Sequence, residues 1–383
     1  MYSAKYTDRI FMLPEDFHLE KRFYYNRLDK HERELYEFWL EALLDGHQTI
    51  IFRLFRDFNA FPDENPIEAP EFFIEEHGGR HIDCFKVYNS MLWDCPELYF
   101  VYHYDPDYKI SGYLCLGGGD EDYSPEEIKE INAWLDEFLH KFDHITDPFQ
   151  LELAVHDYIT EHYDYDYVGG EERENEENYH TRKFYEKFTV TGLFYNGVAV
   201  CGGLIKLIQF VLQRRGLEVA DIIADAGQED NRGLHSWLAV KLGGNYYHLD
   251  LTYDEGDTED RDCPQYTHFN ITDEEICDDH FFTHEDYPEI VCNATEYNYY
   301  HKMGLYFEDP EKITEAFSRY IDSMQSLEDH GRFYFRTPTS LPLGTVKRAL
   351  SRSITGRGFK DHSVDYLENE GYYAIEINGK DYD

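Results

Sequence analysis

The sequence predicts an α+β protein with more than one domain. Capped helical segments are mixed with short strand-like runs along the 383 residues, and no internal repeat is present. Hydrophobic residues make up 42% of the chain, which is enough to form a sizeable core. No stretch approaches the roughly 18 consecutive apolar residues of a membrane-spanning helix, so none is expected.

Residues 1–145 are interpreted as an N-terminal α+β region of unknown role. A helical pattern covers about 30–44, and strand-like runs cover about 97–105 and 109–116. Ser124 with Pro125 and Glu127 forms a capping box that starts a helix to about residue 142. A further helix begins after Thr146 or Asp147.

The central region, residues 146–307, contains a helix that begins at Cys201. Apolar residues recur on one face of this helix with helical spacing, and Gly216 suits the position just past its end. A strand is expected at about 218–224. The apolar residues of the helix face are Leu204, Leu207, Ile208, Val211 and Leu212.

The stretch "GLHSWLAVKLGGNYYHLDLTYDEG" predicts two strands joined by a turn at the glycine pair 243–244. A two-residue turn would place Trp237 opposite Asp250 and His235 opposite Thr252. His235 and Asp250 would then share a sheet face as diagonal neighbours, roughly 7–8 Å apart. A four-residue loop keeps this facing and a three-residue loop does not.

Residues 308–383 are expected to form a small C-terminal α/β module. The pattern there predicts a helix at about 311–324, a strand at "RFYFR", a helix at about 343–351 and a strand at "YYAIEI".

Charge restricts the partners. Lys and Arg number 35 and Asp and Glu 78, which gives a net charge of −43. Such a chain repels nucleic acid and anionic membranes, and it would attract basic partners, although high charge also simply favours solubility. If the substrate is a peptide or protein, charge favours a basic one. The sequence does not fix the oligomeric state.

The cysteines do not suggest a disulfide framework or a zinc ribbon, because their number is odd and no CxxC occurs. The N-terminus lacks a basic stretch followed by an apolar run, so a cytoplasmic protein with reduced thiols is expected. No nucleotide motif is present, and no cofactor or metal is predicted. The seven cysteines are at positions 84, 95, 115, 201, 263, 277 and 292.

Cys201 is the candidate nucleophile. The amides at a helix N-terminus favour the thiolate, which is the reactive form of cysteine. Gly202 and Gly203 would let a substrate carbonyl approach closely and would leave amides for an oxyanion hole. The alternative is a buried, inert cysteine. A carboxylate at Asp250 that orients the His235 imidazole would complete a nucleophilic site.

The segments "GVAVCGG", "LQRRGLEV" and "GLHSWLAVKLGGNYYHLDLTYD" resemble the core of the transglutaminase-like superfamily. The resemblance covers about 146–307 and includes a helix that often precedes the core in bacterial members. It implies a papain-like fold, with the cysteine-bearing helix packed on an antiparallel sheet that carries His and Asp. It also implies Cys201 as nucleophile, His235 as base and acid, and Asp250 as orienting carboxylate. Trp237 would complete the family's H-x-W strand, near the substrate or oxyanion.

The leading interpretation is therefore a cysteine-dependent acyl-transfer enzyme that acts on amide bonds. Hydrolysis, as in a protease or amidase, is favoured over transamidation. Transamidation needs an active site that excludes water, and no feature of the sequence indicates one. One alternative is a non-catalytic peptide-binding or scaffolding protein that retains the fold. Another is an acidic mimic that sequesters basic partners.

Other histidines and acidic residues were weighed as sites. His248 shares the predicted face of Asp250 and ranks second to His235 as the base. His280 and His284 would meet on one face if helical and could hold zinc, but a surface or core-edge role is favoured. His77 and His81 have the same spacing and are weaker. The acidic run 254–262 lacks the calcium-loop spacing, and 169–180 is read as an acidic surface loop.

Overall fold

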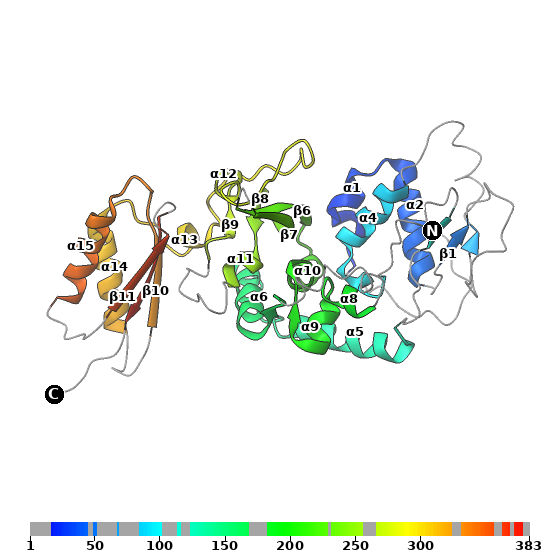
Figure 1. Cartoon of the computed structure of the whole chain (residues 1–383), viewed down its shortest axis with the longest axis horizontal. Coiled ribbons are helices and arrows are strands. Elements are labelled where there is room, and N and C mark those ends of the chain that lie inside the picture. The colour runs from blue at the N-terminus through cyan, green and yellow to red at the C-terminus, as the bar shows by residue number, and fades with distance from the viewer. Residues whose placement is uncertain are drawn as a thin grey trace. The chain divides into compact units, whose positions relative to one another are not determined.

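The computed structural model describes twelve segments of the chain: 17–44, 49–51, 67–68, 84–101, 113–115, 123–167, 182–228, 231–255, 266–323, 331–355, 362–367 and 371–377. The chain divides into two compact units, residues 1–243 and 244–383. Both units mix helices with strands (Figure 1), which confirms the expected α+β composition. The domain boundaries expected at residues 145 and 307 stay predictions.

The first unit consists of helices around several small sheets. β1 pairs with β2 and β3, β4 pairs with β5, and β6 pairs with β7. Its elements are η1 Leu19–Lys21, α1 Phe23–Arg27, α2 Lys30–Leu44, β1 Thr49–Ile51, β2 Ile67–Glu68, α4 Cys84–Asp94, η2 Pro96–Leu98, β3 Tyr113–Cys115, α5 Pro125–His140, α6 Pro148–His162, β4 Asp164–Tyr165, α8 Arg182–Glu186, α9 Val190–Asn196, β5 Val198–Ala199, α10 Cys201–Arg214, β6 Val219–Gln228 and β7 Asn231–Leu242.

The N-terminal segment holds one confirmed helix and one wrong strand. Helix α2 has the expected bounds, but residues 96–98 form the 3-10 helix η2 where a strand was expected. Tertiary contacts explain this difference. The buried Glu97 accepts a hydrogen bond from the guanidinium of Arg22 at 2.9 Å, and the Asp94 carboxylate accepts from the amides of Tyr24 and Tyr25.

The caps of α5 and α6 are as the sequence predicts. Ser124 and Glu127 form a complete capping box at the start of α5. Asp147 caps α6, and Pro148 is its first residue. Helix α5 ends at His140, two residues before the expected end.

Helix α10 runs through the first unit and packs against β6 and β7 (Figure 1). All five apolar residues of its predicted face are buried. Gly216 follows the helix with a φ of 78°, the left-handed conformation typical of a glycine after a helix end. β6 pairs antiparallel with β7 over the whole length of β6, and His235 lies opposite Ala224.

The second unit begins at the glycine turn. Gly243 and Gly244 both have positive φ, 57° and 94°, as a tight two-residue hairpin turn requires. β8 ends at Leu249 and pairs antiparallel with β9. The elements of the second unit are β8 Asn245–Leu249, α11 Leu251–Glu255, β9 Phe269–Ile271, α12 Asp273–Ile276, α13 Tyr299–Lys302, α14 Pro310–Ser323, β10 Gly331–Arg336, α15 Leu343–Ile354, β11 His362–Leu367 and β12 Tyr372–Ile377.

The end of the second unit has its own core. The antiparallel sheet has the order β10-β12-β11, and helices α14 and α15 pack on each other. Strand β11 was not predicted, whereas the other four elements were. The core residues are Phe307, Ile313, Phe317, Ile321, Phe333, Phe335, Val346, Ala349, Leu350, Tyr373 and Ile375.

Candidate active site

Cys201 is the first residue of α10. Val200 precedes it in an extended conformation and provides no side-chain cap. The first amides of an α-helix lack partners within the helix, and here the Gly203 and Leu204 amides both donate to the Val200 carbonyl oxygen. The amides of Cys201 and Gly202 are then the ones that the helix itself leaves without an acceptor. These two amides are the candidate oxyanion donors.

Gly203 has a packing role. A Cβ at this position would lie 2.5 Å from the Cβ of Ala199, 2.7 Å from the Lys187 carbonyl oxygen and 2.9 Å from that of Thr189. Its amide already donates to Val200 at 2.9 Å. The expectation that Gly203 offers a free amide is therefore wrong, because this amide donates to Val200. The missing side chain of Gly203 is required instead by close packing against residues 187–199.

His235 lies on β7 and is buried, with 9% of its surface exposed. The ring of Trp237, two residues on, is stacked on it with centroids 6.1 Å apart and an angle of 19° between the planes. Trp237 is fully buried and is not among the described residues that line the neighbouring pocket. Trp237 therefore contacts the His235 ring from within the core.

Cys201 and His235 line the same pocket, which has a volume of about 520 Å³. Every lining residue that the structure describes belongs to the first unit. One wall comes from residues 88–101, including Trp93 and Tyr99, and another from 184–189. Gly202 also lines it. The pocket thus brings together the nucleophile and base that the sequence predicts.

A second cysteine, Cys95, also lines this pocket. Burial raises the pKa of its thiol to about 12, and its Sγ lies 3.2 Å from the Tyr36 hydroxyl. Cys95 is therefore a protonated thiol at neutral pH. The described cysteines Cys201, Cys277 and Cys292 are also free thiols.

A buried ion pair forms part of the pocket lining. The Lys206 ammonium lies 3.0 Å from the Asp221 carboxylate and also donates to the carbonyl oxygens of Leu92 and Trp93. Asp221 accepts a further hydrogen bond from the Ser236 hydroxyl at 2.5 Å. These groups tie α10, β6 and the N-terminal wall together. The sequence analysis did not single them out.

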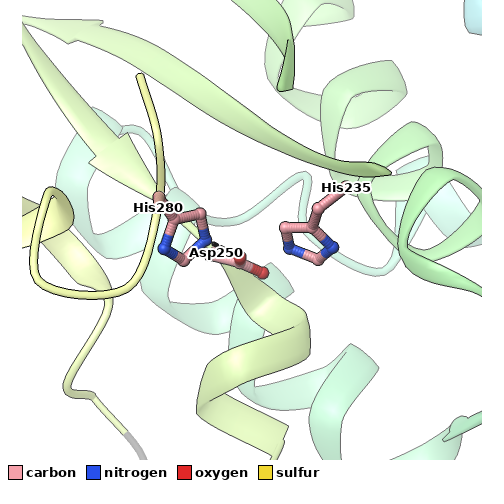
Figure 2. A group of neighbouring side chains, drawn as sticks. All are labelled: His235, Asp250 and His280. Carbon is pink, nitrogen blue, oxygen red and sulfur yellow. Dashed lines mark hydrogen bonds and ion pairs between the residues drawn. The ribbon is translucent and has the colours of Figure 1, made fainter. Parts of the chain in front are cut away.

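Asp250 belongs to the second unit, where it caps α11. One carboxylate oxygen accepts from the Thr252 amide at 2.8 Å, and the other lies 2.9 Å from Nε2 of His280. Both side chains are fully buried, and Figure 2 shows the His280 ring against the Asp250 carboxylate. The expected strand through residue 252 is wrong, because β8 ends at Leu249 and Asp250 caps a helix instead.

His280 and His284 do not lie on a common helix, the condition under which the sequence would let them share a zinc ion. Helix α12 ends at Ile276, and both histidines follow in irregular backbone. His280 is buried, whereas the side chain of His284 is 52% exposed. His284 thus lies at the surface and His280 inside, and the sequence missed His280 as the partner of Asp250.

A second histidine network lies close to His280. His268 Nε2 lies 3.1 Å from the Asp279 carboxylate, which also contacts His280. Burial alone lowers the pKa of His268, but the hydrogen bond and charge of Asp279 outweigh it and raise the pKa to about 9. His268 is accordingly protonated at neutral pH.

His248, the second candidate for the base, pairs with another acid. Its Nε2 lies 2.9 Å from Asp273, and its ring packs edge-on against Phe282. Burial lowers the pKa of His248, and Asp273 only partly offsets this. Asp273, His248 and Cys292 offer ligand atoms within 4.8 Å of one another, a set that could hold a metal ion, although hydrogen bonds also satisfy it.

Some expectations fall on residues outside the described segments. These are His77, His81, the acidic loop 169–180 and most of the acidic run 254–262. Among the described helices, none is long and apolar enough to cross a membrane.

Comparisons with known proteins add little. The sequence matches no protein-family model and no curated protein. A candidate cysteine protease from Cytophaga hutchinsonii is similar at 15% identity and a TM-score of 0.24, covering 32% of this chain and 37% of that one. A TGase is similar at 13% identity and a TM-score of 0.29, covering 35% and 34%. This chain thus spans about a third of each, and likenesses at these TM-scores support no argument about fold or function.

Proposed function

We propose that the protein is a cysteine-dependent acyl-transfer enzyme that acts on amide bonds of peptides or proteins. The observation that carries this proposal is the pocket that Cys201 and His235 line together. A thiol at a helix N-terminus beside a histidine is the arrangement that activates cysteine for attack on a carbonyl carbon.

In the proposed reaction, His235 takes the thiol proton and the Cys201 sulfur attacks the carbonyl carbon. The amides of Cys201 and Gly202 donate to the oxygen on which negative charge develops. His235 then gives the proton to the nitrogen, and the carbon–nitrogen bond breaks. The amine leaves, and a thioacyl enzyme remains.

Asp250 is proposed as the carboxylate that orients His235. The support is the hairpin register expected from the sequence, together with the two-residue turn at Gly243 and Gly244. Its carboxylate is already held by the Thr252 amide and the His280 ring. His280 would then act as a positioning residue for Asp250. The papain-like, transglutaminase-like core is part of the same proposal, supported by the cysteine-bearing helix packed on β7.

Water is the proposed acceptor of the acyl group, which makes the enzyme a protease or amidase. Transamidation by an amine requires a site that excludes water, and no described feature is specific to that task. Incubation with casein and a labelled amine separates the two. Hydrolysis predicts new peptide termini without label, whereas label incorporation that depends on Cys201 would establish transamidation instead.

The first test is alkylation of Cys201 by iodoacetamide at neutral pH, followed residue by residue by mass spectrometry. A free thiol is only a few per cent ionised at pH 7, so His235→Ala should slow Cys201 labelling by about tenfold or more. The exposed Cys277 is an internal reference that should not change.

An unchanged Cys201 rate in His235→Ala would contradict the proposal and favour a peptide-binding protein that retains the fold. That alternative also predicts that Cys201→Ala keeps peptide binding and the cellular phenotype.

A further inference from the structure

The pocket beside Cys201 has a chemistry that selects among acyl donors. Its walls are mainly aromatic and aliphatic, with Trp93 and Tyr99 on one side, Phe188 on another, and Ile223 and Leu234 on the sheet. The volume of about 520 Å³ lies within the range of ligand pockets, roughly 300–1,000 Å³. It therefore holds a large side chain or several small ones.

The polar groups of these walls already have partners. The Tyr99 hydroxyl donates to the Ile128 carbonyl oxygen at 3.1 Å, so a ligand would contact the apolar ring of Tyr99. Lys206 and Asp221 are paired with each other at 3.0 Å, and Lys206 has further acceptors in the backbone of residues 92 and 93. A charged ligand group would lose its water here without gaining an opposite charge, which is unfavourable.

We propose that this pocket binds an uncharged aromatic or branched aliphatic group of the acyl donor, adjacent to the carbonyl that Cys201 attacks. The identity of the occupant as an acyl donor rests on the proposed function, whereas the apolar preference of the pocket does not. The inference replaces the expectation of a basic substrate at this position, because net charge acts over the whole surface and the pocket itself is neutral.

The test uses N-substituted chloroacetamides, which alkylate thiols and differ only in the substituent. The substituents are 2-phenylethyl, 3-methylbutyl, 2-carboxyethyl and 2-aminoethyl, and each rate on Cys201 is divided by the rate on glutathione. Burial of one apolar side chain predicts that the first two label Cys201 about tenfold to a hundredfold faster than the charged pair. Equal normalised rates for all of them would overturn the proposal.

Leu234→Asp locates the preference without disturbing the core. Leu234 is 67% exposed at the rim, so a carboxylate there is tolerated by the fold. The variant should reduce the advantage of the phenylethyl probe and speed the aminoethyl probe. The matched control is Met303→Asp, at an exposed residue that does not line the pocket, and it should behave as the wild type. An unchanged preference in Leu234→Asp contradicts the assignment to this pocket.

His235→Ala separates this inference from the proposed function. If both hold, all probe rates on Cys201 fall while their ratio persists. If the rates do not fall but the ratio persists, the apolar pocket stands and the catalytic proposal fails. If the rates fall and no ratio exists in either protein, the catalytic proposal stands and the apolar pocket fails.

Discussion

Lys206→Met removes one partner of the buried ion pair in the pocket lining. The Lys206 ammonium lies 3.0 Å from Asp221, and the two side chains are only 12% and 3% exposed. The same ammonium donates to the Leu92 and Trp93 carbonyl oxygens and to Gln209. The variant therefore leaves the Asp221 carboxylate buried, with the Ser236 hydroxyl as its remaining side-chain donor among the described residues.

The expected loss in the free energy of unfolding is about 3–5 kcal/mol, the range for breaking a buried pair by removing one partner. Lys241 provides a matched control, because its ammonium is also 3.0 Å from a carboxylate, that of Glu218, in the same unit. That pair is 35% and 29% exposed. Lys241→Met should therefore cost less than about 1 kcal/mol.

Urea denaturation followed by tryptophan fluorescence measures both changes, with the slope m checked for constancy. The double variant Lys206→Met/Asp221→Asn should recover at least half of the loss, because it removes the unpaired charge. A loss in Lys206→Met no greater than that in Lys241→Met would refute the reasoning. So would a double variant less stable than the single one.

Three further changes test other parts of the structure. Gly203→Ala should destabilise the first unit by about 1–3 kcal/mol through overpacking, whereas Gly202→Ala, whose Cβ meets nothing closer than 3.3 Å, should be near neutral; thermal melts compare them. His280→Ala leaves a buried carboxylate short of a donor and should cost about 1–3 kcal/mol, measured by urea denaturation, and a cost near zero would contradict the contact. The pKa of His268 is raised from 6.5 to about 9 in the folded protein. Protonated His268 therefore stabilises the fold fully at pH below 6.5, and this stabilisation is lost as the pH rises through 9. Denaturation at several pH values should show stability falling across this window in the wild type and less in Asp279→Asn, and equal slopes would contradict the assignment.

Local patterns in the sequence predicted the elements that carry the candidate nucleophile and base. The helical period and Gly216 define α10, and the glycine pair defines the turn after β7, because caps and turns depend on residues close in sequence. The signal for α11 was also present, since Asp250 is a good N-cap followed by a helical run, but the alternation of β8 was extended through it.

Long-range contacts could not be predicted in the same way. His280 contacts Asp250, which lies thirty positions earlier in the chain, and no local sequence pattern predicts this contact. The 3-10 helix at 96–98 replaces a strand because Glu97 is held by Arg22, 75 residues earlier. The capping box of Thr272 and Glu275 is a local pattern that marks the start of α12.

The Lys206 contacts bear on where this chain can be cut. A chain trimmed to residues 146–307, the span of the resemblance, would lose the carbonyl oxygens of Leu92 and Trp93 that accept from that ammonium. It would also expose the apolar wall from residues 88–101 that faces Cys201. We expect the trimmed chain to aggregate, so any shortened version should begin ahead of α1.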